Sequence, residues 1–143
     1  MSKENKALVR QMVEQVWQAG NTDAIDEFLA ADVVDHSVPP GMPPGREGSK
    51  AWAAMMTSAM TGSEITIEDE IAEGDLVVTR WSSQATHSGD LMGIPATGKR
   101  VSITGISINR ILDGKIVESW GEADMMGMMQ QLGVVPAPAQ GGD

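Results

Sequence analysis

The feature that most constrains the fold is the separation of two hydrophobic periodicities along the chain. In the first sixty residues apolar side chains recur at helical spacing, as at Val9, Met12, Val13, Val16 and Trp17. After Gly62 they alternate instead, as at Ile65 and Ile67, which is typical of strands with one covered face. Helical patterns that precede a run of strands predict an α+β fold rather than alternating βαβ units.

Turn and capping residues divide these patterns into elements. We expect helices over about 3–19 and 23–30 and a third from Arg46, with a short extended piece at 31–38 and an irregular loop in PPGMPPG. Strands follow in EITIEDEIAEGD, LVVTRWSSQATH, RVSITGISINRIL and KIVESWGEAD, with a tight hairpin at Asp113-Gly114. A short helix closes the pattern at MMGMMQQLG. Three N-terminal helices packed in a strongly curved antiparallel sheet would form a cone with an interior pocket.

Length and composition limit the classes of protein. The chain of 143 residues is predicted to be a single domain over 1–135 followed by a flexible tail at 136–143. It has no cysteine, which excludes disulfides and thiolate sites. Its net charge of −10 disfavours nucleic acid and anionic membrane as partners. No apolar run has the ~20 residues of a membrane span, and the N-terminus lacks a signal-peptide core, so we expect a cytoplasmic protein.

Several segments resemble one known family. NTDAIDEFLAADVVDH, PPGREG, IAEGDLVVTRW, THSGDLMGIPATGKRV, ILDGKIVESW and MMQQLG occur in this order between about Asn5 and Pro136. Together they resemble the SnoaL-like polyketide cyclases, or ester cyclases, of the nuclear-transport-factor-2-like superfamily. The resemblance implies an α+β cone around a pocket for a hydrophobic, carbonyl-bearing small molecule. It also implies a homo-oligomer (dimer or tetramer), and an aspartate that acts as acid/base in an intramolecular aldol closure without metal or cofactor.

The last predicted strand carries the acidic candidates. Simple alternation places Ile116, Glu118, Trp120, Glu122 and Asp124 on one face. If that face lines the hollow, carboxylates beside an indole would have raised pKa values and exchange protons near neutral pH. Asp124 matches the family's aspartate and is our candidate acid/base. An aspartate directly before MMGMMQQ is equally suited to cap that helix, and the sequence leaves both roles open.

The two histidines, His36 and His87, both lie within the family-like segments. The resemblance places them toward the pocket, where they would hold a substrate carbonyl or orient the acid. The alternative is that each ties down a loop. With Asp124 they would supply two histidines and one carboxylate, but no short ligand spacing supports a metal site.

The remaining site candidates are substrate-binding residues. They are Trp120, Glu122, Glu118, Trp81, Arg110 and Met92. Met92 lies in an apolar stretch at 89–98 that we interpret as a lid or a subunit contact. Arg110 also serves a rival hypothesis, a limonene-epoxide-hydrolase-like enzyme, which requires an arginine within hydrogen-bond reach of Asp124. A third hypothesis is a binding module of the same fold that carries a ligand without chemistry.

Overall fold

The computed structural model describes residues 2–135, so the predicted tail at 136–143 lies outside the described residues. Helix α1 spans Ser2–Met12 and continues into a π-helical turn, η1, at Val13–Gln18. A short 3-10 turn, η2 (Thr22–Ala24), leads into α2 (Ile25–Phe28). Helix α3 spans Arg46–Ala59, and α4 spans Met125–Leu132. The four predicted helices are confirmed, although α2 is short because the backbone is already extended at Leu29.

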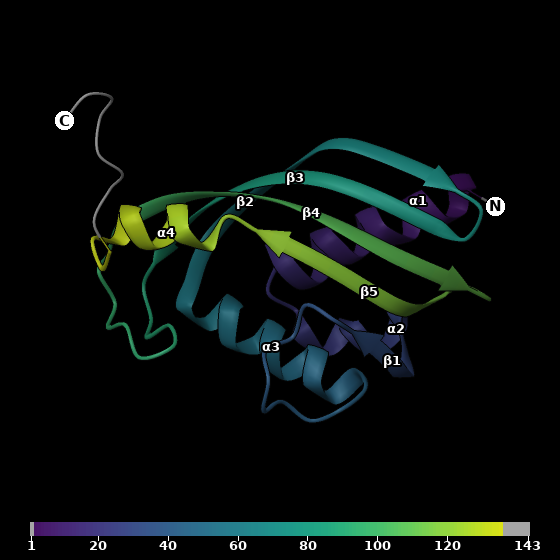
Figure 1. The fold of residues 1–143 in the computed structure, drawn as a ribbon, viewed down its shortest axis with the longest axis horizontal. Coiled ribbons are helices and arrows are strands. Elements are labelled where there is room, and N and C mark those ends of the chain that lie inside the picture. Colours follow the sequence, from purple (N-terminus) through teal and green to yellow (C-terminus); the bar gives the residue numbers. More distant parts are fainter. Residues whose placement is uncertain (1, 136–143) are drawn as a thin grey trace.

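The sheet has five strands. They are β1 (Leu29–Asp35), β2 (Met60–Glu73), β3 (Leu76–His87), β4 (Arg100–Leu112) and β5 (Lys115–Ala123), in the spatial order β1-β5-β4-β3-β2. Strands β2 to β5 form an antiparallel meander, whereas β1 pairs with β5 in parallel. The sheet is therefore mixed rather than wholly antiparallel, because α3 carries the chain from one edge strand to the other. Figure 1 shows the sheet curving over α1, α2 and α3.

Alternate residues of each strand face the helices. On β4 the helix-facing residues include Val101, Ile103, Asn109 and Ile111, all of them buried. We call this side the concave face and the opposite side, which α1, α2 and α3 do not cover, the open face (Figure 1). The α+β architecture with helices on one face of a curved sheet is confirmed.

Two hydrophobic clusters occupy the concave face. The first joins α1, η1, α2 and β1 to the ends of three strands through Val9, Val16, Phe28, Val77, Ile111 and Ile116. The second lies at the other end of the sheet and contains Ala59, Met60, Ala85, Leu91, Val101, Ile103, Met128 and Leu132. Burial of these side chains supplies most of the stabilisation of the domain.

Helix α4 takes the place of a strand beside β4. Strand β5 ends at Ala123, and the Asp124 N–H then donates to the Thr104 carbonyl at 2.9 Å. The Gln131 side chain accepts from the Ser102 N–H and donates to its carbonyl, so it pairs with β4 as a strand backbone would. In the described part of the chain no helix is both long and apolar enough to cross a membrane.

Candidate functional site

A band of polar side chains separates the two hydrophobic clusters on the concave face. We call it the polar belt; it consists of Thr79, Ser107, Asn109 and Ser119. Ser107 lies opposite Thr79 on β3, and Asn109 lies opposite Ser119 on β5. The Ser119 hydroxyl donates to Asn109 Oδ1 at 2.8 Å, and the Asn109 side chain is buried. A few fixed polar groups between apolar walls are typical of a small-molecule site.

Trp81 lies beside this belt, on the same face of the sheet. Its indole N–H donates to the Ser107 hydroxyl at 3.2 Å. The ring occupies space that a side chain at Gly105 would need, because a Cβ there would overlap the indole. Trp81, which we expected to bind substrate, is therefore a half-buried residue of the concave face, packed against the second cluster.

His87 is fully buried at the end of β3 near the second cluster. Its Nδ1 accepts from the Thr97 N–H at 3.2 Å and lies 3.0 Å from the Thr97 hydroxyl, which itself accepts from the Lys99 N–H. Because Nδ1 accepts, the proton of the neutral ring is on Nε2. That Nε2 is buried and has no partner among the described residues. His87 thus ties down the 89–98 loop and also presents a donor that no described residue accepts.

Asp124 is exposed at the junction of β5 and α4. Its Oδ1 accepts the Gly127 N–H at 2.9 Å, which makes it the N-cap of α4. A Cβ at Gly127 would overlap the carboxylate, so the glycine leaves room for it. The predicted capping role is confirmed, and the catalytic role stays a prediction.

The expected orientation of the last strand is wrong. Ile111 pairs with Ile116, but Arg110 pairs with Glu118, so β5 carries one extra residue at Val117. This bulge reverses the alternation. Ile116 points into the core, while Glu118, Trp120 and Glu122 point to the open face.

Four predicted site residues form one cluster on that open face. His36 stacks on Trp120 with the ring centroids 5.2 Å apart, and its Nε2 lies 2.8 Å from a Glu118 oxygen. The guanidinium of Arg110 lies 6.0 Å from the Trp120 ring and pairs with Asp75 at 2.9 Å. These residues come together, but on the side of the sheet opposite the polar belt.

The other candidates are more scattered. Glu122 is exposed opposite Ile106, and Met92 is exposed in its loop. The two histidines do not lie together, because His36 is on the open face with Glu118 and Trp120, whereas His87 is buried on the concave face. Within residues 2–135 no group of three or more potential ligands is placed to hold a metal ion.

Glu70 is a concave-face residue that the sequence interpretation missed. It lies opposite Thr79, its side chain is only 8% exposed, and its Oε1 pairs with Arg10 of α1 at 2.6 Å. Burial raises the pKa of Glu70, and the positive charges of Arg10 and Lys6 oppose that shift. Its Oε2 and the Thr79 hydroxyl are both buried without a partner among the described residues.

One sequence signal could have located the belt. Along β4 the odd positions carry Val101, Ile103, Gly105, Ser107, Asn109 and Ile111. A polar interruption within an otherwise apolar phase marks a covered face with a special site. The signal was hidden because the even positions also carry apolar residues, Ile106 and Ile108. The sequence therefore did not show whether the odd or the even positions of this strand are buried.

Comparison with protein families gives a match over most of the chain. Residues 7–132 match the family described as SnoaL-like polyketide cyclase. An aklanonic acid methyl ester cyclase, DauD of Streptomyces sp. (strain C5), is 35% identical over 130 residues, covering 88% of this chain and 80% of that relative. The aklanonic acid methyl ester cyclase DnrD of Streptomyces peucetius is also 35% identical over 130 residues, covering 88% of both chains.

Solved structures give the same answer for the fold. The structure of TsrD from Streptomyces laurentii matches with a TM-score of 0.80 at 30% sequence identity, covering 91% of this chain and 98% of that chain. The family match, the curated relatives and the curved α+β architecture agree, and the chain belongs to the SnoaL-like polyketide cyclase family.

Proposed function

We propose that the protein is a polyketide cyclase that closes a ring by cofactor-free acid/base chemistry, an intramolecular aldol addition within a hydrophobic, carbonyl-bearing molecule bound at the concave face. Two kinds of observation support this proposal. The relatives are ester cyclases, and the concave face combines methionine-rich apolar walls with a small set of oriented polar groups. Such a surface suits a large, mostly apolar substrate with a few oxygen atoms.

The observation that carries the proposal is the unpaired Nε2–H of His87. A buried donor with no acceptor costs free energy, and a substrate carbonyl that accepted from it would recover that cost. In an aldol closure the same bond would stabilise the negative charge that develops on the carbonyl oxygen. The two bonds from Thr97 hold the ring and its tautomer in place for this task.

Asp124 is the proposed base. Capping Gly127 engages one carboxylate oxygen and leaves lone pairs for a second partner. The base would take a proton from the carbon next to one carbonyl, the resulting enolate carbon would bond to a second carbonyl carbon, and the new alkoxide would take up the proton. The Nε2–H of His87 would donate to that alkoxide oxygen as it forms.

The decisive experiment separates the base from the cap. Asn and Ser cap helices about as well as Asp, whereas Ala loses roughly 1 kcal/mol. Asp124→Asn and Asp124→Ser should therefore keep the melting temperature and lose turnover, and Asp124→Ala should lose both. The methyl ester of aklanonic acid, named for two of the relatives, is the first test substrate. Normal turnover by Asp124→Asn would exclude Asp124 as the base.

A binding module is the second candidate, and the exposure of Asp124 favours it. It predicts that native mass spectrometry finds a co-purifying ligand that is released chemically unchanged. The epoxide-hydrolase-like hypothesis has less support. Arg80 pairs with Asp69 and Arg110 with Asp75, both on the open face, so neither has the arrangement with Asp124 that this chemistry needs.

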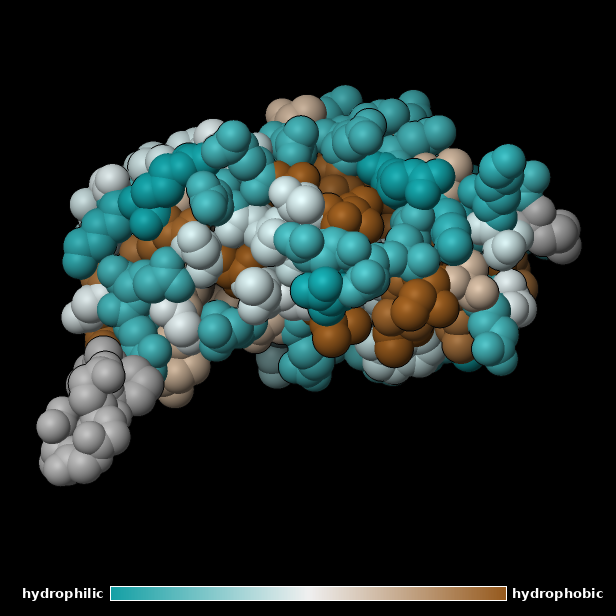
Figure 2. Space-filling model, turned by 90° about the horizontal axis from the view of Figure 1, so that it is seen from above, coloured by the Kyte–Doolittle hydropathy of each residue, from teal (hydrophilic) through white to brown (hydrophobic). Residues whose placement is uncertain are grey.

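We also propose that the open face joins two copies of the chain. Four exposed apolar side chains lie on it: Val34 at 52% exposure, Ile71 at 62%, Ile106 at 49% and Leu112 at 48%. In Figure 2, apolar surface gathers among the polar side chains of this side of the molecule. Exposed apolar patches on a sheet are typical of subunit contacts. Ile106→Glu should halve the mass measured by light scattering, and an unchanged mass would exclude this interface.

A further inference from the structure

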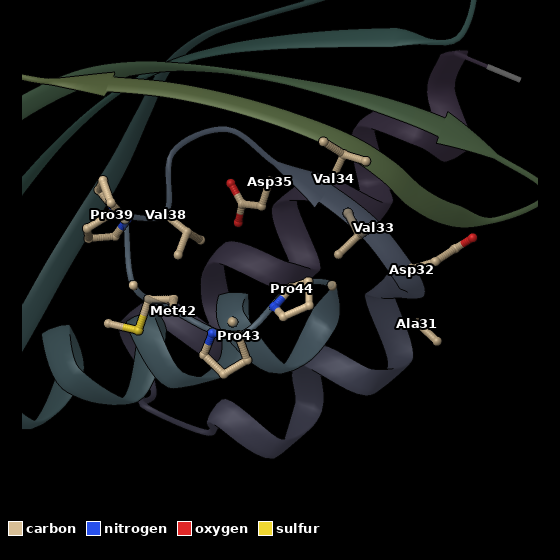
Figure 3. Close-up of a pocket in the computed structure, with 14 residues that line it drawn as sticks. Ala31, Asp32, Val33, Val34, Asp35, Val38, Pro39, Met42, Pro43 and Pro44 are labelled. Atoms are coloured by element: carbon tan, nitrogen blue, oxygen red, sulfur yellow. The ribbon is translucent and has the colours of Figure 1, made fainter.

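A cavity of about 610 Å³ lies between β1 and the proline-rich loop that follows it, away from the polar belt. Figure 3 shows Val33 and Asp35 on the strand side and Met42, Pro43 and Pro44 on the loop side. We propose that this cavity is a second binding site, for a small apolar amine. No residue of the polar belt lines it, so it is distinct from the site proposed for cyclisation.

The strand side of the cavity is fixed by one carboxylate. Asp35 Oδ1 accepts the Ser37 N–H at 3.0 Å and the Ser37 hydroxyl, and Oδ2 accepts the Ser49 hydroxyl of α3 at 2.8 Å. Three donors therefore hold the start of the loop against both β1 and α3. Four prolines between Val38 and Gly45 restrict the loop further, because each fixes its own φ.

The far end of the loop is held by close backbone contacts. Gly45 has φ +72°, and a Cβ there would lie 2.7 Å from the Ala31 carbonyl oxygen, so the loop returns tightly onto β1. A Cβ at Gly48 would overlap the Pro43 carbonyl. Between these two fixed ends the loop stands away from the strand and leaves the cavity.

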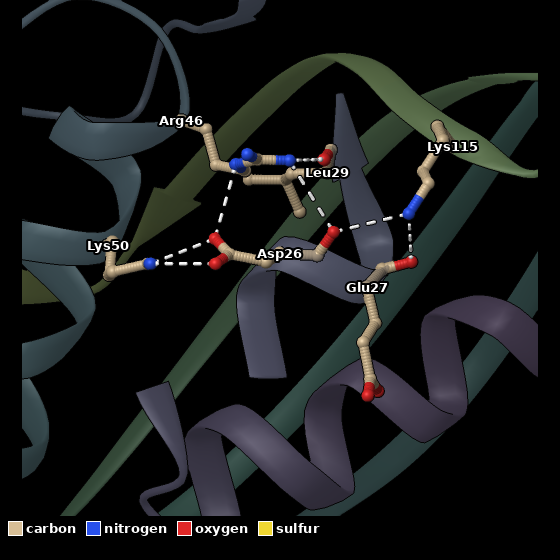
Figure 4. A network of polar contacts seen from close by, with 6 residues as sticks. All are labelled: Asp26, Glu27, Leu29, Arg46, Lys50 and Lys115. Atoms are coloured by element: carbon tan, nitrogen blue, oxygen red, sulfur yellow. Dashed lines mark hydrogen bonds and ion pairs between the residues drawn. The ribbon is translucent and has the colours of Figure 1, made fainter. Parts of the chain in front are cut away.

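A network of cations fixes the elements behind the cavity (Figure 4). Arg46 donates to the Leu29 carbonyl at 3.2 Å and pairs with Asp26, which also pairs with Lys50 at 2.8 Å. The hydrogen bond from Lys50 lowers the pKa of Asp26. Lys115 donates to the backbone carbonyl of Glu27 at 2.7 Å. Helices α2 and α3 and strands β1 and β5 are thus joined, and the cavity is preformed rather than created by a ligand.

The polar groups of the cavity determine the kind of ligand. The His36 N–H donates to the Ser119 carbonyl on β5. In an edge strand that pairs in parallel, the backbone groups of successive residues point alternately to the neighbouring strand and to the free edge. The backbone N–H and C=O groups of Val33 and Asp35 therefore point to the free edge. In the described chain no backbone hydrogen bond joins residues 38–45 to β1. The lining residues include Asp32 and Asp35 and contain no Lys, Arg or His, and in Figure 3 Asp35 lies between the strand and the loop while the Asp32 carboxylate points outward. A ligand with an apolar body and a positively charged N–H donor complements this set.

Three probes with one ring system and different charge test the proposal: tryptamine, indole and indole-3-acetate. Methionine methyl NMR gives a readout for each site, because Met42 lines this cavity while Met56, Met125 and Met129 pack against the second cluster. Tryptamine should shift the Met42 signal and bind at least about tenfold more tightly than indole, as expected for one charge-assisted hydrogen bond. Indole-3-acetate should leave Met42 unchanged.

Two variants keep the test falsifiable. Ala31→Trp should fill the cavity and remove the tryptamine shift at Met42, while Thr66→Trp on the open face should leave it intact. Because Ala31→Trp could disturb the Gly45 contact, Asp32→Lys provides an independent check and should weaken tryptamine binding several-fold. Shifts at Met125 and Met129 in place of Met42, equal binding of all three probes, or no binding would overturn the proposal.

Discussion

The concave and open faces are built from alternate residues of the same strands, yet they differ in whether their polar groups have partners. On the concave face Glu70, Thr79 and His87 each have a buried polar atom without a partner in the described chain. On the open face the charges are paired, across strands in Arg80 with Asp69 and Arg100 with Glu64, and to the β2–β3 turn in Arg110 with Asp75. Buried polar groups without a partner cost stability, whereas paired surface charges cost little.

The apolar residues of the two faces differ in how deeply they are buried. Ile116 on the concave face is fully buried, and Ile106 on the open face is 49% exposed. The first contributes to folding within one chain. The second gains its full burial only against another molecule. The comparison therefore separates residues that stabilise the fold from residues that would serve the proposed contact between two copies.

Truncating these two isoleucines tests the comparison most strongly. Ile116→Ala should lower the free energy of unfolding by about 2–5 kcal/mol, because it leaves a cavity in the first cluster. Ile106→Ala should cost less than about 1 kcal/mol in the monomer, since half of the side chain is already in water. Urea denaturation of each variant gives both values. Equal losses would mean that the open face is covered within the chain.

The polar belt gives the next largest effect. Asn109→Ala removes a buried side chain and leaves the partly buried Ser119 hydroxyl without its acceptor, and the expected loss is about 1–3 kcal/mol. Ser119→Ala leaves the buried Asn109 Oδ1 without its donor but removes only one oxygen atom, so its loss should lie in the lower part of the same range. A double-mutant cycle should give a coupling near 1 kcal/mol. Additive losses would show that this hydrogen bond contributes nothing to stability.

The stability cost of the buried polar groups on the concave face depends on pH, because one of these groups is the Glu70 carboxyl. Its pKa is raised by burial, so the folded protein holds the proton more tightly than the unfolded chain does. The proton therefore stabilises the fold at pH values below the ordinary glutamate pKa, and this stabilisation is lost as pH rises through the raised pKa. Glu70→Gln should be more stable than the parent at neutral pH, and the advantage should shrink on acidification toward the ordinary glutamate pKa.

Denaturation curves of both proteins at several pH values measure that difference. Arg10→Gln serves as the control, because it removes the charge that opposes the shift and should deepen the loss of stability at neutral pH. A Glu70→Gln variant that is less stable than the parent at neutral pH would show that the ion pair with Arg10 outweighs the cost of burial.

The sequence predicted the elements well, because their signals are local. Gly20, the Asp113-Gly114 hairpin and the change of periodicity after Gly62 each depend on a few neighbouring residues. The parallel pairing of β1 was missed because nothing within Leu29–Asp35 specifies which distant strand it joins. Topology of this kind is determined by long-range packing.

The candidate site was harder to predict, for a physical reason that one residue illustrates. Val117 is the extra residue of a bulge, and it turns the whole acidic strand to the other face. The structure brings His36 together with Trp120 and Glu118, but on the face of the sheet opposite to the one expected. Capping by Asp124 was foreseen, because an N-cap depends only on the next three residues. Glu70 was missed because its burial comes from α1, sixty residues earlier.

The smallest predicted effect concerns the ion pairs of the open face. Arg80 and Asp69 approach to 2.6 Å, but both side chains are more than half exposed. Such a pair gains little, because water screens the attraction and both side chains lose rotational freedom. A double-mutant cycle of Arg80→Ala and Asp69→Asn should give a coupling below about 1 kcal/mol that decreases further in 0.5 M salt. A larger, salt-resistant coupling in the oligomer would mean that a second copy excludes water from this pair, and it would place Arg80 inside the proposed subunit contact.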